Sequence, residues 1–257
     1  MAAESLPTLY NTDSSYYSMI ARLALAEAGM AYTSRPVDIH RGRENQQPWF
    51  VRLNPEMTVP VLVDGDRVLP DSHLILDAAL PRPAAGAQAE LLSRLYRFPV
   101  DQFTFAWLMR WNPVVRFLFP RKLAEIRGDM LQLAAQNPDL ADAYRKRAAV
   151  FDQRVAAFSQ PPGPRWTALA AEADALLAEM EAQLGAAGPL FGGAAVNATD
   201  VLATVFLARL RFCRQGRRIG ARPAVAAYWD RVHGRPSFRQ ADVWDRLRPS
   251  LVLRLIG

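Results

Sequence analysis

The segment Asn54-Pro55-Glu56-Met57-Thr58-Val59-Pro60-Val61-Leu62 decides the fold of this chain. A proline is accepted in a sheet at an edge or at the first residue of a strand, so Pro60 predicts the start of a strand. Proline is also the residue type for which a cis peptide bond costs little free energy. A cis Val59–Pro60 bond would turn the backbone N–H and C=O of Val59 outward, where they can pair with an extended, peptide-like ligand.

Strand and helix patterns alternate on both sides of this segment. Apolar residues recur at helical spacing through residues 15–28, and Gly29 then ends the pattern. Two apolar runs joined by an Asp64-Gly65-Asp66 turn predict a hairpin, and Asp71-Ser72 open a further helix. The predicted order is β-α-β-α-β-β-α. Its elements are strands at 8–10, 31–38, 59–63 and 67–69, helices at 15–28 and 73–80, and a short helix after the polar stretch 41–47.

The clearest linker is Pro81-Arg82-Pro83-Ala84-Ala85-Gly86, and no strand pattern stands out beyond it. We therefore predict an α/β domain over residues 1–81 and an all-helical domain over residues 88–257, with prolines such as Pro120 marking helix ends. Asn197 and Asp200 have the spacing of a capping box at a helix start. The best helical stripe consists of Trp166, Leu169, Ala173, Leu176, Leu177, Met180 and Leu184.

Composition limits the class of protein. The 257 residues are 51% hydrophobic and carry a net charge of +6, which suits a folded chain of one or two domains. No apolar run is long enough to span a membrane, the first residues lack a secretory signal, and Cys213 is the single cysteine. We expect a cytoplasmic protein without disulfides, a metal site or a membrane partner. The arginines of 209–222 come with no nucleic-acid-binding motif, so we expect no nucleic-acid partner.

Hydroxyl side chains gather between the first strand and the first helix, in Asp13-Ser14-Ser15-Tyr16-Tyr17-Ser18. The free N–H groups and the dipole of a helix N-terminus favour an anion, and they lower the pKa of a thiol placed there. A plain helix cap is the alternative interpretation of these serines. Asp71-Ser72 would suit the ammonium and carboxylate of an amino-acid head group. Glutathione has the three parts that these positions would hold: an amino-acid head, a peptide backbone and a thiol.

The segment 54–62, followed by Asp64-Gly65 and Leu69-x-Asp71-Ser72, resembles the glutathione-binding half of the cytosolic glutathione S-transferases. The resemblance implies a thioredoxin-like N-terminal domain, an all-helical C-terminal domain, glutathione as co-substrate and a homodimer. The glutathione-binding positions that it implies are Thr58, Val59, Pro60, Asp71 and Ser72.

Within that superfamily the chain is similar to the tetrachlorohydroquinone reductive dehalogenases and to the ganglioside-induced differentiation-associated proteins. The shared features include Val51-Arg52-Leu53-Asn54 and a long helical insert around Asn137-Pro138-Asp139-Leu140. The dehalogenases use a cysteine near the start of the first helix, where Tyr17 stands in this chain. The resemblance therefore favours substitution or ether cleavage over reductive dehalogenation.

In the serine-type transferases a serine activates the thiol, and the resemblance matches that serine to Ser15 of this chain. Ser14 and Ser18 are further candidates. Tyr17 or Tyr16 is an alternative donor, because other classes use a tyrosine, and Tyr10 is a more distant one. The glycine end of glutathione needs a cation or an amide, and the pattern does not choose among the candidates. They are His40, Arg41, Arg43, Gln46 and Gln47, of which Gln47 enters the predicted site.

Aromatic residues near the start of the helical domain suit a pocket for an aromatic co-substrate. Phe103, Trp107 and Trp111 lie at i, i+4 and i+8, on one helix face, and Tyr16 and Phe105 add to the set. Ordinary core packing is the alternative interpretation of this stripe. The predicted substrate-binding residues are Tyr16, Phe103, Trp107 and Trp111.

The predicted function is a glutathione S-transferase or a glutathione-dependent lyase for aromatic ethers or halogenated aromatics, in degradation or detoxification. The thiolate of glutathione would attack the electrophilic carbon of the aromatic substrate. The alternative is a binding or scaffold protein on the same fold that has lost catalysis. The apolar tail 251–256 would pack on the body of the protein or over the pocket.

Overall fold

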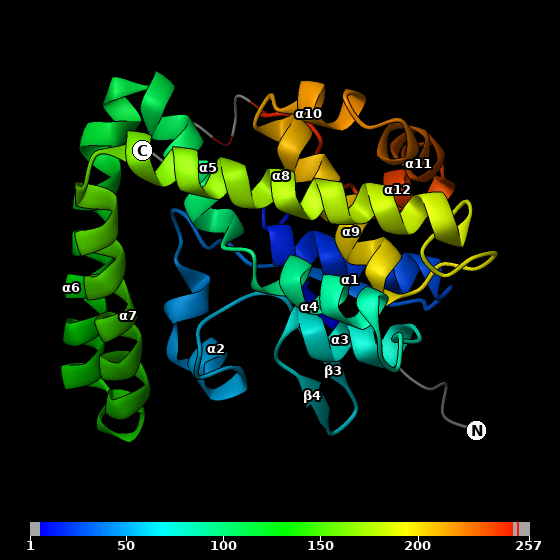
Figure 1. The fold of residues 1–257 in the computed structure, drawn as a ribbon. Helices are drawn as coiled ribbons and strands as arrows, with labels where there is room; N and C mark the ends of the chain where they lie inside the picture. The colour runs from blue at the N-terminus through cyan, green and yellow to red at the C-terminus, as the bar shows by residue number, and fades with distance from the viewer. Residues whose placement is uncertain (1–5, 249–250, 252–257) are drawn as a thin grey trace, which may run out of the picture.

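The computed structural model describes residues 6–248 and 251 (Figure 1). Its N-terminal part is a mixed sheet in the order β2-β1-β3-β4, in which β1 pairs parallel with β2 and antiparallel with β3. The predicted element order and the thioredoxin-like fold are confirmed. The elements are β1 (Thr8–Asn11), α1 (Tyr16–Glu27), β2 (Thr33–Pro36), η1 (Glu44–Gln46), α2 (Pro48–Leu53), β3 (Val61–Asp64), β4 (Arg67–Leu69) and α3 (Ser72–Ala79).

Both faces of this sheet are covered. Leu9 of β1 lies opposite Leu62 of β3, and both pack under α1 and α3 against Leu25 and Ile75. The opposite face carries a smaller cluster around Phe50 of α2, which buries Val37, Val59 and Val61. The Asp64-Gly65 turn has the left-handed backbone at Gly65 that a tight hairpin requires.

The remaining described elements are all helical, as predicted. The expected stripe on α8 is buried, with Ala173, Leu177 and Met180 fully inaccessible. The expected insert is a long hairpin of α6 and α7, which extends alongside α2 in Figure 1. The helices are α4 (Ala87–Arg97), α5 (Val100–Trp111), α6 (Pro113–Gln136), η2 (Pro138–Leu140), α7 (Ala141–Ser159), α8 (Pro162–Ala187), α9 (Ala198–Phe212), α10 (Gly216–Gly220), α11 (Pro223–His233) and α12 (Pro236–Gln240).

Most helix-domain prolines occupy first turns, where a missing N–H costs nothing. Pro113, Pro223 and Pro236 are examples. Pro120 is an exception to the prediction, because α6 runs through it without ending. An interior proline removes one helical hydrogen bond. The long packing of α6 against α7 keeps the helix continuous despite that loss.

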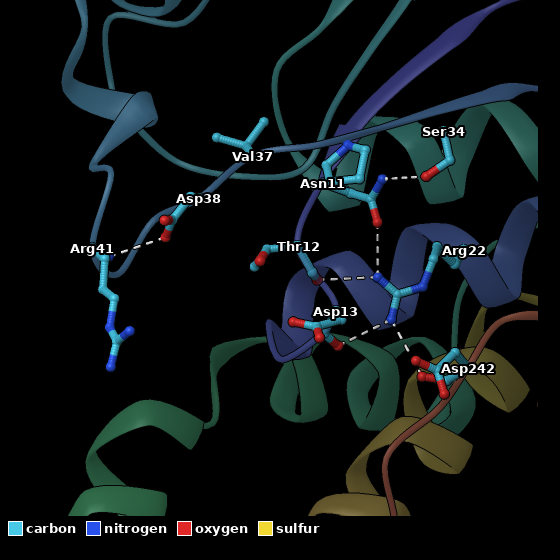
Figure 2. A pocket seen from close by; sticks show the side chains of 10 residues that line it. Asn11, Thr12, Asp13, Arg22, Ser34, Val37, Asp38, Arg41 and Asp242 are labelled. Atoms are coloured by element: carbon cyan, nitrogen blue, oxygen red, sulfur yellow. Dashed lines mark hydrogen bonds between the residues drawn. The ribbon is translucent and has the colours of Figure 1, made fainter. Parts of the chain in front are cut away.

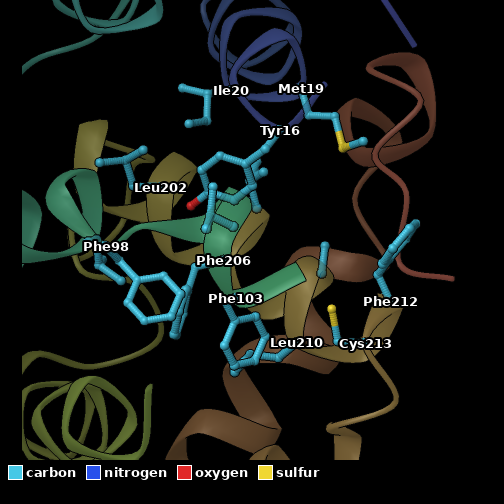
Figure 3. Packing of buried hydrophobic residues seen from close by; sticks show 14 of the residues in the cluster. Tyr16, Met19, Ile20, Phe98, Phe103, Leu202, Phe206, Leu210, Phe212 and Cys213 are labelled. Carbon is cyan, nitrogen blue, oxygen red and sulfur yellow. The ribbon is translucent and has the colours of Figure 1, made fainter. Parts of the chain in front are cut away.

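The two parts of the chain share one apolar core. Figure 3 shows Tyr16, Met19 and Ile20 of α1 packed among buried side chains of the helical part, including Leu202 and Phe206 of α9. α3 ends at Ala79 and α4 begins at Ala87, so the predicted linker lies between two helices. We keep the limits 1–81 and 88–257 as a proposal for the domains.

Two further sequence expectations concern the ends and the surface of the chain. Leu251 is buried and lines a cavity described below, whereas the rest of the apolar tail lies outside the described residues. None of the helices within residues 6–248 and 251 has the length and apolar character needed to cross a membrane.

The capping box at α9 is confirmed. The Asn197 side chain accepts hydrogen bonds from the N–H groups of Thr199 and Asp200, and the buried Asp200 carboxylate accepts one from the Asn197 N–H at 3.1 Å. Asp200 also accepts from the Phe191 and Gly192 N–H groups at 2.9 and 3.0 Å.

Replacing Asp200 should destabilise the fold strongly. Asp200→Ala would leave several buried donors without an acceptor, so we expect the free energy of unfolding to fall by about 3 kcal/mol. Asp230→Ala, an exposed aspartate on α11, is the matched control and should cost less than about 0.5 kcal/mol. Urea denaturation of both variants measures the difference, and equal effects would show that the Asp200 hydrogen bonds contribute little.

Candidate active site

Two adjoining cavities lie where the sheet part meets the helical part. Their volumes are about 430 and about 190 Å³, and both are lined by Ser15, Tyr17, His40, Asp101 and Phe105. We call the pair the interdomain cavity. The larger cavity extends to Val59 and the α6–α7 hairpin, and the smaller one extends to α9.

Ser15 lies at the N-terminus of α1, as predicted. It is the N-cap residue, and its hydroxyl oxygen accepts a hydrogen bond from the Ser18 N–H at 3.2 Å. Because the oxygen serves as acceptor in the cap, the hydroxyl proton remains available to a ligand in the cavity. Ser14 is buried, and its Oγ lies 3.1 Å from His40 Nε2. Ser18 is fully buried and does not line the interdomain cavity.

The two tyrosines that follow also reach the cavity. Tyr17 lines both of its parts, and Tyr16 lines the smaller one. Burial, reinforced by the carboxylates of Asp101 and Asp71, raises the pKa of Tyr17 to about 12. At neutral pH the phenol of Tyr17 is therefore protonated, so it can donate a hydrogen bond as a neutral group but cannot act as a base. Tyr10 packs against Trp49 and does not line the cavity.

The Thr58–Val59 backbone lies across the cavity from the serines. The Val59–Pro60 peptide bond is cis, and the Val59 N–H and C=O have no hydrogen-bond partner among the described residues. The buried Asn54 fixes this loop, because its Nδ2 donates to Thr58 O at 2.9 Å and to Pro70 O at 3.2 Å. The backbone beside Val59 is thus open to a peptide-like ligand.

Asp71 and Ser72 lie beside the cavity but do not line it. Asp71 caps α3 by accepting from the His73 N–H, and the Tyr96 hydroxyl donates to its Oδ1 at 2.5 Å. The rings of Tyr96 and Tyr17 pack with their centroids 6.5 Å apart. These contacts connect Asp71 to the cavity through two tyrosine rings.

The candidates for the glycine end separate clearly. Gln46 is buried and lines the larger cavity, whereas Gln47 is exposed at the N-cap of α2 and lines neither part. The predicted position Gln47 is therefore displaced by one residue from the side chain that reaches the cavity. Arg41 lines a different cavity, and Arg43 forms ion pairs with Glu125 and Asp129 of α6.

The predicted aromatic stripe lies mainly in the core. Phe103 is fully buried in the core, as Figure 3 shows, and its ring packs against that of Trp166. Trp107 is 6% exposed in the same cluster. Trp111 is 72% exposed at the end of α5. Because the apolar face of α5 packs inward, Phe105 on another face is the α5 ring that lines the cavity.

The cavity-lining residues that belong to the α6–α7 insert were not predicted from the sequence. Phe105 stacks on Phe119 of α6 with centroids 3.9 Å apart, and Phe151 of α7 completes the aromatic wall. Arg147 and Arg154 of α7 also line the larger cavity. No local motif marks these positions, since more than 80 residues separate Arg147 from Val59 in the sequence.

Polar atoms without partners concentrate at this site. Within residues 6–248 and 251, eight buried side-chain nitrogen and oxygen atoms have no hydrogen-bond partner. Such atoms are uncommon in folded proteins, and a bound ligand or ordered water commonly supplies the partner that the chain does not. Five belong to residues that line the interdomain cavity, namely Tyr16, Asn45, Gln46, Arg147 and Arg154.

A separate cavity of about 450 Å³ contains Arg22, Asp38, Arg41 and Asp242 (Figure 2). Its buried guanidinium is already used by the chain, because Arg22 donates to Ala241 O at 2.7 Å and to Asn11 Oδ1 at 2.9 Å. Arg41 is the only predicted ligand-binding candidate that lines this cavity, and none of the hydroxyl candidates or residues 58–60 does, so the interdomain cavity is the better candidate for the active site.

Known proteins resemble this chain both in its sheet part and over nearly its whole length. Residues 14–79 match the sequence model of the family described as "Glutathione S-transferase, N-terminal domain". The tetrachloro-p-hydroquinone reductive dehalogenase of Sphingobium chlorophenolicum is 31% identical over 245 residues, which cover 92% of this chain and 95% of the relative. The chain belongs to the glutathione S-transferase family.

Other similar proteins extend over most of the chain. Ganglioside-induced differentiation-associated protein 1-like 1 of Homo sapiens is 25% identical and covers 92% of this chain and 73% of its own length. A structure titled glutathione S-transferase III in apo form superimposes with a TM-score of 0.62 at 22% identity. It covers 95% of this chain and 99% of that chain, which shows the shared fold.

Two sequence features of this glutathione S-transferase family member lie largely outside the interdomain cavity. Cys213 is fully buried beside α9, and burial raises the pKa of its thiol to about 12. Within the arginine-rich stretch 209–222, Arg209 lines the smaller cavity, while Arg218 and Arg222 form ion pairs with Asp174.

Proposed function

We propose that this protein is a glutathione-dependent transferase or lyase that acts on an aromatic electrophile. The observation that carries the proposal is the cluster of unpartnered polar groups around the interdomain cavity, together with the unpaired Val59 backbone. A tripeptide matches these groups, because its amides and carboxylates supply both donors and acceptors. We propose that the buried Ser72 hydroxyl, with Asp71, binds the amino-acid head of the tripeptide at the edge of the cavity.

Glutathione, when bound, supplies a thiol that becomes a nucleophile once it is deprotonated. The N-terminus of α1 favours the thiolate through its free N–H groups and dipole. Ser15 adds a hydroxyl proton that is not used by its own cap. Tyr17 adds a second neutral donor in the same cavity. We propose Ser15 as the principal donor, with Tyr17 and Ser14 as the alternatives.

The aromatic wall supports an aromatic second substrate. Phe105, Phe119 and Phe151 present rings on the helical side of the larger cavity. Such rings pack favourably against another aromatic ring. The reductive dehalogenase of S. chlorophenolicum acts on a halogenated aromatic by its name. We propose substitution or ether cleavage for this chain, because its single cysteine is in the core rather than at the cavity.

A binding or scaffold protein on the same fold is the second candidate. The name of one relative, ganglioside-induced differentiation-associated protein 1-like 1, mentions no reaction, and a non-catalytic role for this chain is therefore the second candidate. A scaffold would have no need for the open Val59 backbone or for unpaired polar atoms beside a cavity. Turnover of an aromatic halide with glutathione separates the two candidates.

Glutathione should bind the native protein, and the binding should depend on Ser72. Ser72→Ala removes a hydroxyl expected to bond a carboxylate, so we expect the dissociation constant to rise roughly 10- to 100-fold. Isothermal calorimetry measures this change, with the exposed Ser159→Ala as the matched control. Absence of glutathione binding by the unaltered protein would contradict the proposed function.

Ser15 and Tyr17 should be distinguishable by the ionisation of bound glutathione. Ser15→Ala is expected to raise the thiol pKa and to slow turnover at neutral pH by as much as about 100- to 1000-fold, with little change in affinity. Tyr17→Phe should have the smaller effect. The ultraviolet absorbance of the bound thiolate as a function of pH measures the pKa directly. The reverse ranking of the two variants would assign the role to Tyr17.

We also propose a homodimer, the assembly typical of this family. Val68 on β4 and Leu74 on α3 expose apolar side chains that a second copy would cover. Light scattering at micromolar concentration should give twice the mass of one chain. The mass of a single chain would contradict the proposal.

A further inference from the structure

The α6–α7 hairpin gives the larger cavity a positive wall. Lys122 of α6 and Arg147 and Arg154 of α7 line this cavity, against the single carboxylate of Asp101. His40 lines it as well, with its Nε2 beside the Ser14 hydroxyl. The permanent cations of the wall therefore outnumber its carboxylates, although the same wall is rich in aromatic rings.

The three cations differ in how their charge is compensated. Arg154 pairs with Asp101 at 3.5 Å, and Lys122 pairs with Glu125 at 3.5 Å. Arg147 has no ion pair with any residue of the described chain, and its buried Nε has no acceptor there. Its guanidinium lies 5.5 Å from the centre of the Phe151 ring.

A largely buried guanidinium without a direct ion pair costs free energy in the unliganded protein, even though the carboxylates of Glu56 and Asp101 lie near enough to act on its charge. Burial, and then the neighbouring Arg154, lower the pKa of Arg147, and the carboxylates of Glu56 and Asp101 oppose this shift in part. The arginine remains protonated at neutral pH. An anionic ligand would supply the missing partner and regain that free energy. A planar carboxylate or a phenolate matches the guanidinium, which offers several N–H donors in one plane.

We propose that Arg147 forms an anion subsite for the second substrate, which is then an aromatic electrophile carrying a carboxylate or phenolate. The inference rests on the proposed glutathione-dependent function. Phe151 and Phe119 would hold the ring, and Arg147 would hold its anionic group.

The glycine carboxylate of glutathione is a second source of the same chemistry. Position along α7 favours the electrophile. Tyr144 is the α7 residue that meets the Gln46 segment, since its hydroxyl donates to Gln46 O at 2.7 Å. Arg147 lies one turn further along α7, in the direction of Phe151 and Arg154. Arg154 in turn meets Asp101 beside the start of α1.

The test compares 4-chloro-3-nitrobenzoate with the neutral 4-chloro-3-nitrobenzamide, which has nearly the same shape. We expect the native protein to favour the benzoate, and Arg147→Gln to lower its kcat/KM roughly 10- to 100-fold while changing the amide less than about twofold. Arg147→Lys keeps the charge and should recover part of the preference. Arg145→Gln is the matched control, because Arg145 is an exposed arginine on the same helix.

Calorimetry gives a readout that does not depend on turnover. The benzoate should bind the native protein and bind Arg147→Gln at least about tenfold more weakly, with glutathione affinity unchanged. The proposal would be overturned if the native protein had equal kcat/KM for the benzoate and the amide, or if Arg147→Gln bound the benzoate as tightly as the native protein does. If Arg147→Gln bound glutathione more weakly and lost kcat/KM equally for the benzoate and the amide, the anion held by Arg147 would be the glycine carboxylate, which would overturn the proposal. If the benzoate binds through Arg147 but glutathione does not bind the native protein, the subsite stands and the proposed function fails.

Discussion

The buried guanidinium of Arg22 is the interaction on which the geometry of the site depends. It donates to Asn11 Oδ1 and to the carbonyls of Thr12, Asp13 and Asp242 (Figure 2). It also donates to the carbonyl of Ala241. One side chain thus joins the end of β1 to the chain that follows α12. Because the next residues are the serines at the start of α1, this network fixes where the candidate hydroxyls lie relative to the helical part.

The insert provides a second set of constraints on the opposite side of the cavity. Arg43 pairs with α6, Tyr144 binds the backbone of Gln46, and Arg52 pairs with Asp139 at 2.9 Å. The pair with Asp139 is exposed and contributes little free energy by itself. Together the contacts hold the loop before α2 against the hairpin, so the insert both positions the Gln46 segment and supplies the aromatic and cationic wall of the larger cavity.

The site combines satisfied and unsatisfied polar groups in a consistent way. Groups that shape the backbone, such as Asn54 and Asp200, are fully used within the chain. Residues that line the cavity, such as Gln46 and Arg147, each have a buried side-chain atom without a partner among the described residues, namely Gln46 Oε1 and Arg147 Nε. A rigid frame with open polar groups is the arrangement that binds a polar ligand without a large cost of ordering the protein.

The sequence by itself determined the features that depend on near neighbours. The helix starts at Ser15 and at Asp71-Ser72, the Asp64-Gly65 turn and the capping box at Asn197 each need only a few consecutive residues, and the structure contains all of them. Tertiary structure decided which side chains reach the cavity. Gln46 rather than Gln47 and Phe105 rather than Phe103 face it, because the burial of a helix or turn depends on what packs against it. Arg147 lines the cavity only because the α6–α7 hairpin packs against the sheet part. Contacts between segments this far apart in the sequence leave no local sequence pattern.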